Sequence, residues 1–97
     1  MHWLLIYDYV DDYLERREAL LADHLAHARA AVARGELALG GAFADEPPGA
    51  VIIFRAPSRD VVESFARTDP YVVGGLVKGW TVRQWTTVVG EGALTPL

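Results

Sequence analysis

The first third of the chain passes from the apolar pattern of a strand to that of a helix. Residues Trp3 to Tyr9 are apolar and rich in aromatic side chains, which predicts a β-strand. Asp11 and Asp12 follow, and acidic residues favour the start of a helix. From there to about Arg34 no glycine or proline interrupts a helical spacing of apolar residues, and Gly35 stands where a C-terminal cap is expected. The predicted apolar stripe consists of Leu14, Leu21, Leu25, Ala28 and Val32.

The middle of the chain has the pattern of a β-hairpin. Leu37 to Phe43 reads as a strand, and the pair Gly40-Gly41 inside it predicts a bulge or a close approach of backbone or ligand. The segment from Asp45 to Gly49 has the composition of a turn, with two prolines and a glycine. Ala50 to Arg55 should therefore return antiparallel to the preceding strand.

The last part of the chain predicts a short helix and a final strand. Ser58 is a favourable N-cap. The apolar side of the helix after it would consist of Val61, Val62, Phe65 and Ala66. The tripeptide Asp69-Pro70-Tyr71 starts another turn, and a strand is expected over roughly Trp80 to Val89. Residues 90–97 contain few polar anchors, so we expect this tail to fray or to pack on a partner.

The predicted order of elements is β-α-β-β-α-β, which is the ferredoxin-like arrangement of the α+β class. It consists of a four-stranded antiparallel sheet with two helices on one face. The length of 97 residues suits a single domain over residues 1–97.

Both faces of this sheet are predicted to be apolar, although two helices can cover only one. Alternate positions from Trp3 to Tyr7 are apolar on both sides, and Val51 to Phe54 repeat this pattern. In the last strand Trp80 and Val82 lie on one side and Trp85 on the other. An exposed apolar face of this size usually marks an interaction site. We therefore expect a homodimer that packs sheet against sheet.

Composition excludes several classes of partner and of chemistry. The chain has no cysteine, which removes disulfides, thiolate nucleophiles and zinc–thiolate sites. A net charge of −4 is opposite to the sign that binds phosphate backbones, so no nucleic acid is expected as a partner. The apolar runs are far shorter than the ~20 residues of a membrane span. The residues before the first predicted strand have no basic region and no small-residue cleavage site of a signal peptide, so a cytoplasmic location is expected.

His24 and Asp69 are the candidates for an acid–base site. His24 lies at the border of the predicted apolar stripe, where a side chain can touch a cavity and still exchange protons with solvent. A histidine is the natural general base near neutral pH, and a neighbouring carboxylate would fix its tautomer. Arg17 lies two turns earlier along the same line of the helix and could neutralise a carboxylate or enolate on a substrate.

Each of these residues also has a purely structural interpretation. His24 could be a structural histidine, and Asp69 could simply cap a helix that begins with Pro70. Arg17 could be solvated or paired with an acidic neighbour. Tyr71 could line a pocket or pack on the second helix. The sequence pattern leaves these alternatives open.

No metal or nucleotide motif accompanies these residues. His24 and His27 lie three positions apart, but without the acidic partner of a His-Glu-x-x-His pattern. The pairs Gly40-Gly41 and Gly74-Gly75 lack the flanking residues of a phosphate-binding loop. We therefore expect no metal and no cofactor.

An ordered set of motifs resembles the YciI-like (YCII-related) family of small dimeric α+β-barrel proteins over essentially the whole chain. The motifs are His24-Leu25, Gly35, Gly40-Gly41-Ala42, Asp69-Pro70-Tyr71, Gly75-Leu76-Val77, Trp80 and Trp85. The resemblance implies a ferredoxin-like protomer, a dimeric barrel and an active site that contains a histidine and an aspartate. These two residues correspond to His24 and Asp69.

The resemblance also suggests a function. Relatives of this fold include lactone isomerases and dehydrochlorinases, which implies isomerisation or elimination on a small cyclic or aromatic substrate. Arg17, Tyr71 and Gly41 are the expected substrate-binding residues. The alternatives are a non-catalytic small-molecule-binding module and a haem- or quinol-handling monooxygenase. Leu20 and Leu21 stand where relatives carry an additional arginine before the histidine, so the resemblance does not specify the substrate.

Overall fold

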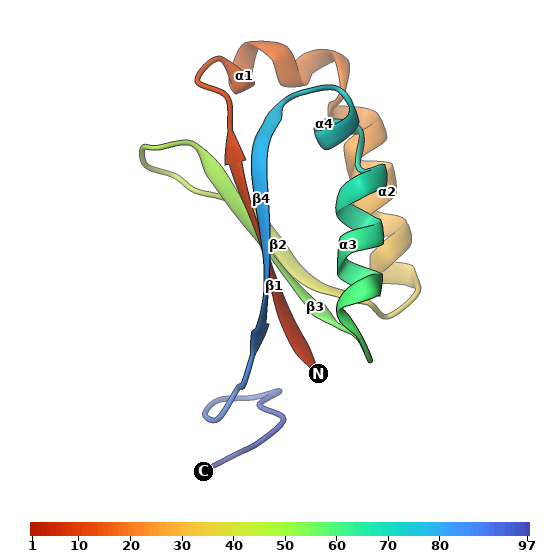
Figure 1. Cartoon of the computed structure of the whole chain (residues 1–97), viewed down its shortest axis with the longest axis vertical. Helices are drawn as coiled ribbons and strands as arrows, with labels where there is room; N and C mark the ends of the chain where they lie inside the picture. The colour runs from red at the N-terminus through yellow and green to blue at the C-terminus, as the bar shows by residue number, and fades with distance from the viewer.

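The computed structural model describes all 97 residues and has the predicted ferredoxin-like fold. The elements are β1 (His2–Tyr9), α1 (Tyr13–Arg16), a 3-10 turn η1 (Arg17–Ala19), α2 (Leu21–Ala33), β2 (Leu37–Ala42), β3 (Gly49–Arg55), α3 (Arg59–Thr68), α4 (Pro70–Val73) and β4 (Val77–Trp85). The strands form one antiparallel sheet in the order β2-β3-β1-β4. Helices α2, α3 and α4 lie on one face of it (Figure 1). None of the helices has the length and apolar character needed to cross a membrane.

The prediction of one uninterrupted helix before Gly35 is wrong, because the chain breaks at Leu20. The short helix α1 and the turn η1 precede this residue, and α2 follows it. Leu20 packs closely on Gly74, where an added Cβ would lie 2.6 Å from the Leu20 side chain. This tertiary contact overrides the local helical pattern. Two residues of the predicted apolar stripe, Leu14 and Val32, are exposed.

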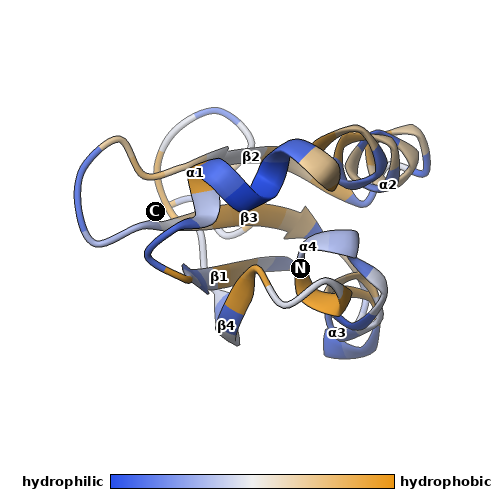
Figure 2. Ribbon diagram, turned by 90° about the horizontal axis from the view of Figure 1, so that it is seen from above, coloured by the Kyte–Doolittle hydropathy of each residue, from blue (hydrophilic) through white to orange (hydrophobic).

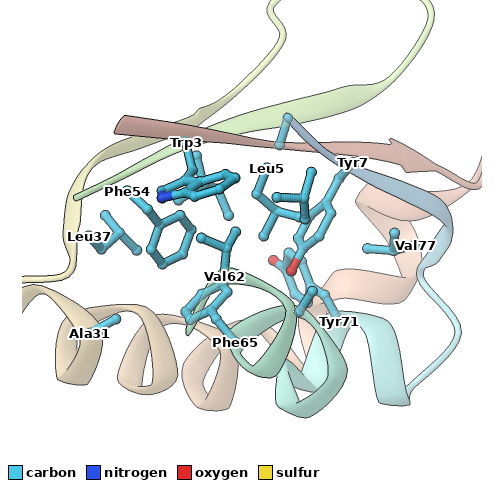
Figure 3. Packing of buried hydrophobic residues seen from close by; sticks show 14 of the residues in the cluster. Trp3, Leu5, Tyr7, Ala31, Leu37, Phe54, Val62, Phe65, Tyr71 and Val77 are labelled. Atoms are coloured by element: carbon cyan, nitrogen blue, oxygen red, sulfur yellow. The ribbon is translucent and has the colours of Figure 1, made fainter. Parts of the chain in front are cut away.

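The hydrophobic core lies between the sheet and the helices. Trp3, Leu5 and Tyr7 alternate inward along β1, as their spacing predicts (Figure 3). The predicted apolar side of α3 is confirmed, and Phe65 packs edge-on against Phe54 of β3 with ring centroids 5.1 Å apart. The core residues of α3 are Val62, Phe65 and Ala66. Ser58 occupies the N-cap position, although its side chain makes no capping hydrogen bond.

The opposite face of the sheet has no helix over it. Pairs of apolar residues face each other there, with Leu4 opposite Ile53 and Ile6 opposite Val51. All four are half-buried, and Trp85 on the same face is 44% exposed. Figure 2 shows β3 as a hydrophobic strand, with α2 and α3 on one side of the sheet only. The sequence pattern therefore identified an apolar face that this single chain leaves uncovered.

The position of the bulge in β2 and both ends of β4 differ from the prediction, since β4 begins at Val77 and not near Trp80. The register of β2 shifts between Leu37 and Leu39, so the bulge lies just before the glycine pair. Strand β4 ends at Trp85 and not near Val89, because its neighbour β1 begins at His2, the residue paired with Trp85. Beyond that point no strand is left to pair with.

The C-terminal tail folds back on residues 87–88, just beyond the end of β4. The amide of Leu97 donates to the carbonyl of Val88 at 2.9 Å, and the amide of Thr95 donates to the carbonyl of Thr87 at 3.0 Å. The hydroxyl of Thr87 also contacts Nδ1 of His2 at 2.8 Å. Packing of this tail on a partner stays a prediction.

Candidate active site

His24 and Asp69 come from distant parts of the chain and meet in the helix layer. His24 lies near the start of α2, and Asp69 is the residue immediately before α4. The distance between His24 Nδ1 and Asp69 Oδ1 is 2.7 Å. Asp69 is completely buried, whereas the His24 side chain is 14% exposed. The contact forms because α2 and α4 pack against each other.

The carboxylate of Asp69 accepts hydrogen bonds from three groups. Oδ1 accepts from His24 and also from the backbone amide of Tyr71 at 3.0 Å, which caps α4. Oδ2 accepts from the hydroxyl of Tyr7 at 2.8 Å. A buried carboxylate is tolerated only when its oxygens are paired in this way. Helix capping and contact with His24 are therefore not alternatives, since one side chain does both.

The imidazole of His24 is held on one nitrogen and on one ring face. An ionised carboxylate can only accept, so Nδ1 donates to Asp69 and the neutral ring has its lone pair on Nε2. The ring stacks on Tyr71, with centroids 3.7 Å apart and planes 4° from parallel. Nε2 forms no hydrogen bond within the chain. It is the nitrogen available to a ligand.

A cavity of about 430 Å³ lies beside His24, a volume typical of small-molecule sites. It is open to solvent and lies between α2 on one side and β2 and β3 on the other. Its apolar side chains include Leu21, Leu25, Ala28, Val32, Leu37, Leu39 and Ile52. Its polar side chains are Arg17, His24, Tyr9 and Tyr71. The cavity thus combines a mostly apolar wall with a few polar groups near the histidine.

Arg17 is the cationic side chain of this cavity. It is half-buried and forms neither an ion pair nor a side-chain hydrogen bond within the chain. The neighbouring Arg16, in contrast, lies 3.8 Å from Asp12. The salt-bridged interpretation of Arg17 is therefore wrong, while the solvated interpretation stays open, and its unpaired guanidinium can meet either water or a ligand.

The phenols of the cavity remain neutral hydrogen-bond donors at neutral pH. Burial raises the pKa of Tyr9 and the pKa of Tyr71 above the usual value for tyrosine. Arg17 lines the same cavity, and its positive charge opposes the rise in the pKa of both tyrosines. Arg17, Tyr9 and Tyr71 therefore offer donors to an oxyanion.

The other predicted positions differ in their relation to the cavity. Tyr71 both lines it and packs in the core, with only 3% of its surface exposed. Gly41 contributes backbone to the lining, and a Cβ added there would meet nothing within 4 Å. His27 lies outside the cavity and contacts the carbonyl of Phe65 at 3.0 Å. No group of three or more histidine or acidic side chains could hold a metal ion.

Two residues at this site were missed from sequence. Tyr7 and Tyr9 lie at inward positions of β1, where the sequence pattern predicts only aromatic residues of the core. Their hydroxyl groups could have indicated a polar partner in the core, because phenylalanine would fill the same volume without burying a polar atom. The three tryptophans do not line this cavity, and Trp3 instead donates to the carbonyl of Ala56 at 3.1 Å.

Fold and geometry together define a ferredoxin-like α+β protein in which a partly exposed histidine is paired with a buried carboxylate at the edge of an apolar cavity. The model of the YCII-related domain matches residues 1–86, so the chain belongs to the YCII-related family, as its motifs predict. A search among curated proteins finds no match.

The chain is also similar to a solved structure of 5-chloro-2-hydroxyhydroquinone dehydrochlorinase (TftG) from Burkholderia phenoliruptrix AC1100, in complex with 2,5-dihydroxybenzoquinone. The two sequences are 26% identical and the TM-score is 0.78. The similarity covers 96% of this chain and 99% of that chain.

Proposed function

We propose that this protein is an enzyme in which His24 transfers protons during elimination or isomerisation of a small cyclic or aromatic substrate. The observation that carries the proposal is the environment of His24. Its Nδ1 is bound to a buried carboxylate at 2.7 Å, and its free Nε2 belongs to a side chain that lines an apolar cavity. A base of this kind needs a fixed tautomer and access to substrate, and both are present.

A hydroxylated ring that carries a leaving group suits this arrangement. His24 would remove a proton from a ring hydroxyl and return it to the ring carbon that bears chlorine, giving the keto tautomer. Chloride would then leave with the bonding electron pair while His24 takes a second hydroxyl proton. The ring becomes a quinone and the net loss is HCl, so no separate oxidant is needed. The similarity to a dehydrochlorinase supports this reaction class.

The direct test is an assay for chloride release from 5-chloro-2-hydroxyhydroquinone, together with thermal-shift measurements on 2,5-dihydroxybenzoquinone. Bound ligand raises the apparent stability of the folded chain. Release of chloride at a rate proportional to enzyme concentration would support the proposal. Binding of the quinone without turnover of this substrate or of other hydroxylated rings would instead favour a non-catalytic binding module.

Arg17 is proposed to bind an ionised ring oxygen of the substrate, a contact made already in the ground-state complex and kept in the transition state. A charge-assisted hydrogen bond contributes about 1.5–3 kcal/mol, so Arg17→Gln should raise KM by about tenfold or more. The change in kcat should be smaller. Arg16→Gln is the matched control, because the adjacent guanidinium does not line the cavity. Equal effects of the two variants would show that Arg17 has no specific role.

We further propose that two copies associate through the open face of the sheet. The half-buried pairs around Ile6 and Val51 support this, since apolar rows of this kind are usually covered. Light scattering at micromolar concentration should give twice the chain mass of 10.6 kDa. Ile6→Lys should give the single mass, because a lysine would be desolvated in the interface. Ala30→Lys, on the exposed side of α2, should leave the dimer intact. A monomeric wild type would rule out this assembly.

A further inference from the structure

Tyr7 is a buried titratable residue with one polar contact. Its side chain is fully buried, and it extends from β1 toward the helix layer, where it lies next to Tyr71 (Figure 3). Its hydroxyl donates to Asp69 Oδ2 at 2.8 Å and makes no other hydrogen bond. The proposed reaction requires no proton from it.

Core packing does not account for this hydroxyl. On the neighbouring strand β3, Phe54 is also fully buried on the helix-facing side of the sheet and carries no polar atom. A phenylalanine at position 7 would fill nearly the same volume without the desolvation of a hydroxyl group. The polar atom of Tyr7 is thus explained by its acceptor, the carboxylate of Asp69.

The carboxylate needs an external constraint on its rotation. The terminal torsion of an aspartate side chain is broad, so the rotamer preference of Asp69 does not fix the plane of its carboxylate. The two donors on Oδ1, from His24 and the amide of Tyr71, lie on the same oxygen. The hydroxyl of Tyr7 is the single donor to the other oxygen, Oδ2, and this hydrogen bond fixes the position of Oδ2.

We infer that Tyr7 is a positioning residue that holds Asp69 in the orientation in which Oδ1 meets Nδ1 of His24. This inference rests on the proposed function, and it assigns to the reaction a residue that has no contact with the cavity. Tyr7 would affect the reaction indirectly, through the side chains of Asp69 and His24.

The donor role of Tyr7 does not depend on pH in the working range. Burial raises the pKa of Tyr7 far above that of a free tyrosine, and the negative charge of Asp69 raises it further. The hydroxyl therefore keeps its proton wherever the carboxylate is ionised, and the contact is not lost on titration of the phenol.

The test compares Tyr7→Phe with Tyr13→Phe in the full chain. Tyr13 is a half-buried neighbour of Tyr9 whose hydroxyl makes no hydrogen bond, so it controls for loss of a phenol. Misplacement of a catalytic group can cost up to about a hundredfold in rate. Tyr7→Phe should lower kcat by about tenfold or more, with KM changed less than about threefold. Tyr13→Phe should change neither.

A second readout does not depend on turnover. In protein with ¹⁵N-labelled histidine, the Nδ1 proton of His24 should exchange with solvent at least about tenfold faster in Tyr7→Phe, because a mobile carboxylate protects it less. If Tyr7→Phe fails to fold, site-specific replacement of Tyr7 by p-aminophenylalanine supplies a donor of similar size. That variant should retain slow exchange and most of kcat.

The outcomes separate this inference from the proposed function. If His24→Ala is inactive while Tyr7→Phe matches the wild type in kcat and in exchange, the function stands and the inference is wrong. If no turnover is found, faster exchange in Tyr7→Phe alone still supports the positioning role. Unchanged exchange in Tyr7→Phe overturns it.

Discussion

Replacement of His24 by alanine is expected to lower turnover by about 10²- to 10⁴-fold, the usual contribution of a general acid–base group. The variant has no other group in position to accept the proton, because the remaining polar side chains of the cavity are an arginine and two phenols of raised pKa. The affinity for 2,5-dihydroxybenzoquinone should change much less, since most of the cavity wall is apolar and unaltered. Steady-state kinetics and calorimetric titration measure the two effects separately.

His27→Ala is the matched control for this experiment. His27 lies one turn further along α2, and its ring contacts the carbonyl of Phe65 outside the cavity. Its removal should leave kcat and KM close to the wild-type values. Retention of more than a tenth of wild-type turnover in His24→Ala would contradict the assignment of His24 as the catalytic base.

Replacement of Asp69 by alanine is expected to have the largest effect on stability. It leaves the donors of Tyr7, His24 and the amide of Tyr71 without their acceptor and removes the cap of α4. The two side-chain donors left unsatisfied cost about 1–3 kcal/mol each and the lost cap costs about 1 kcal/mol, so the free energy of unfolding should fall by about 3–7 kcal/mol. The corresponding fall in melting temperature is on the order of 15–50 °C for a domain of this size.

Asp69→Asn separates the chemical role of Asp69 from its structural role. The amide oxygen can still accept from His24 and Tyr71, so the free energy of unfolding should fall by only about 1–2 kcal/mol. The neutral amide no longer stabilises a protonated imidazole, however, and turnover should fall by about 10²- to 10⁴-fold. Denaturant titration and kinetics on the same samples make the comparison. An Asn variant with wild-type turnover would show that the negative charge of Asp69 is not needed.

The sequence predicted best those elements whose packing agrees with their local pattern. In β1 the inward positions Trp3, Leu5 and Tyr7 are buried, and in α3 helical spacing places the predicted apolar side toward the core. It failed at Leu20, where contact with Gly74 across the fold interrupts a pattern that locally favours helix. It also extended the last strand too far, because the end of β4 depends on where β1 begins. Local periodicity contains no information about either contact.

For the candidate site, too, the sequence predicted some features and the tertiary structure decided others. The sequence by itself determined the fold class and the family, and it predicted the two residues at the centre of the candidate site, because residue type and motif order carry that information. It also predicted Arg17 near His24 along one helix; the helix breaks between them at Leu20, but both side chains line the same cavity. Only the tertiary structure decided that Arg17 is free of ion pairs and that the hydroxyl of Tyr7 meets Asp69. A periodic pattern gives the direction of a side chain relative to its own element. The group that it then meets depends on how separate elements pack.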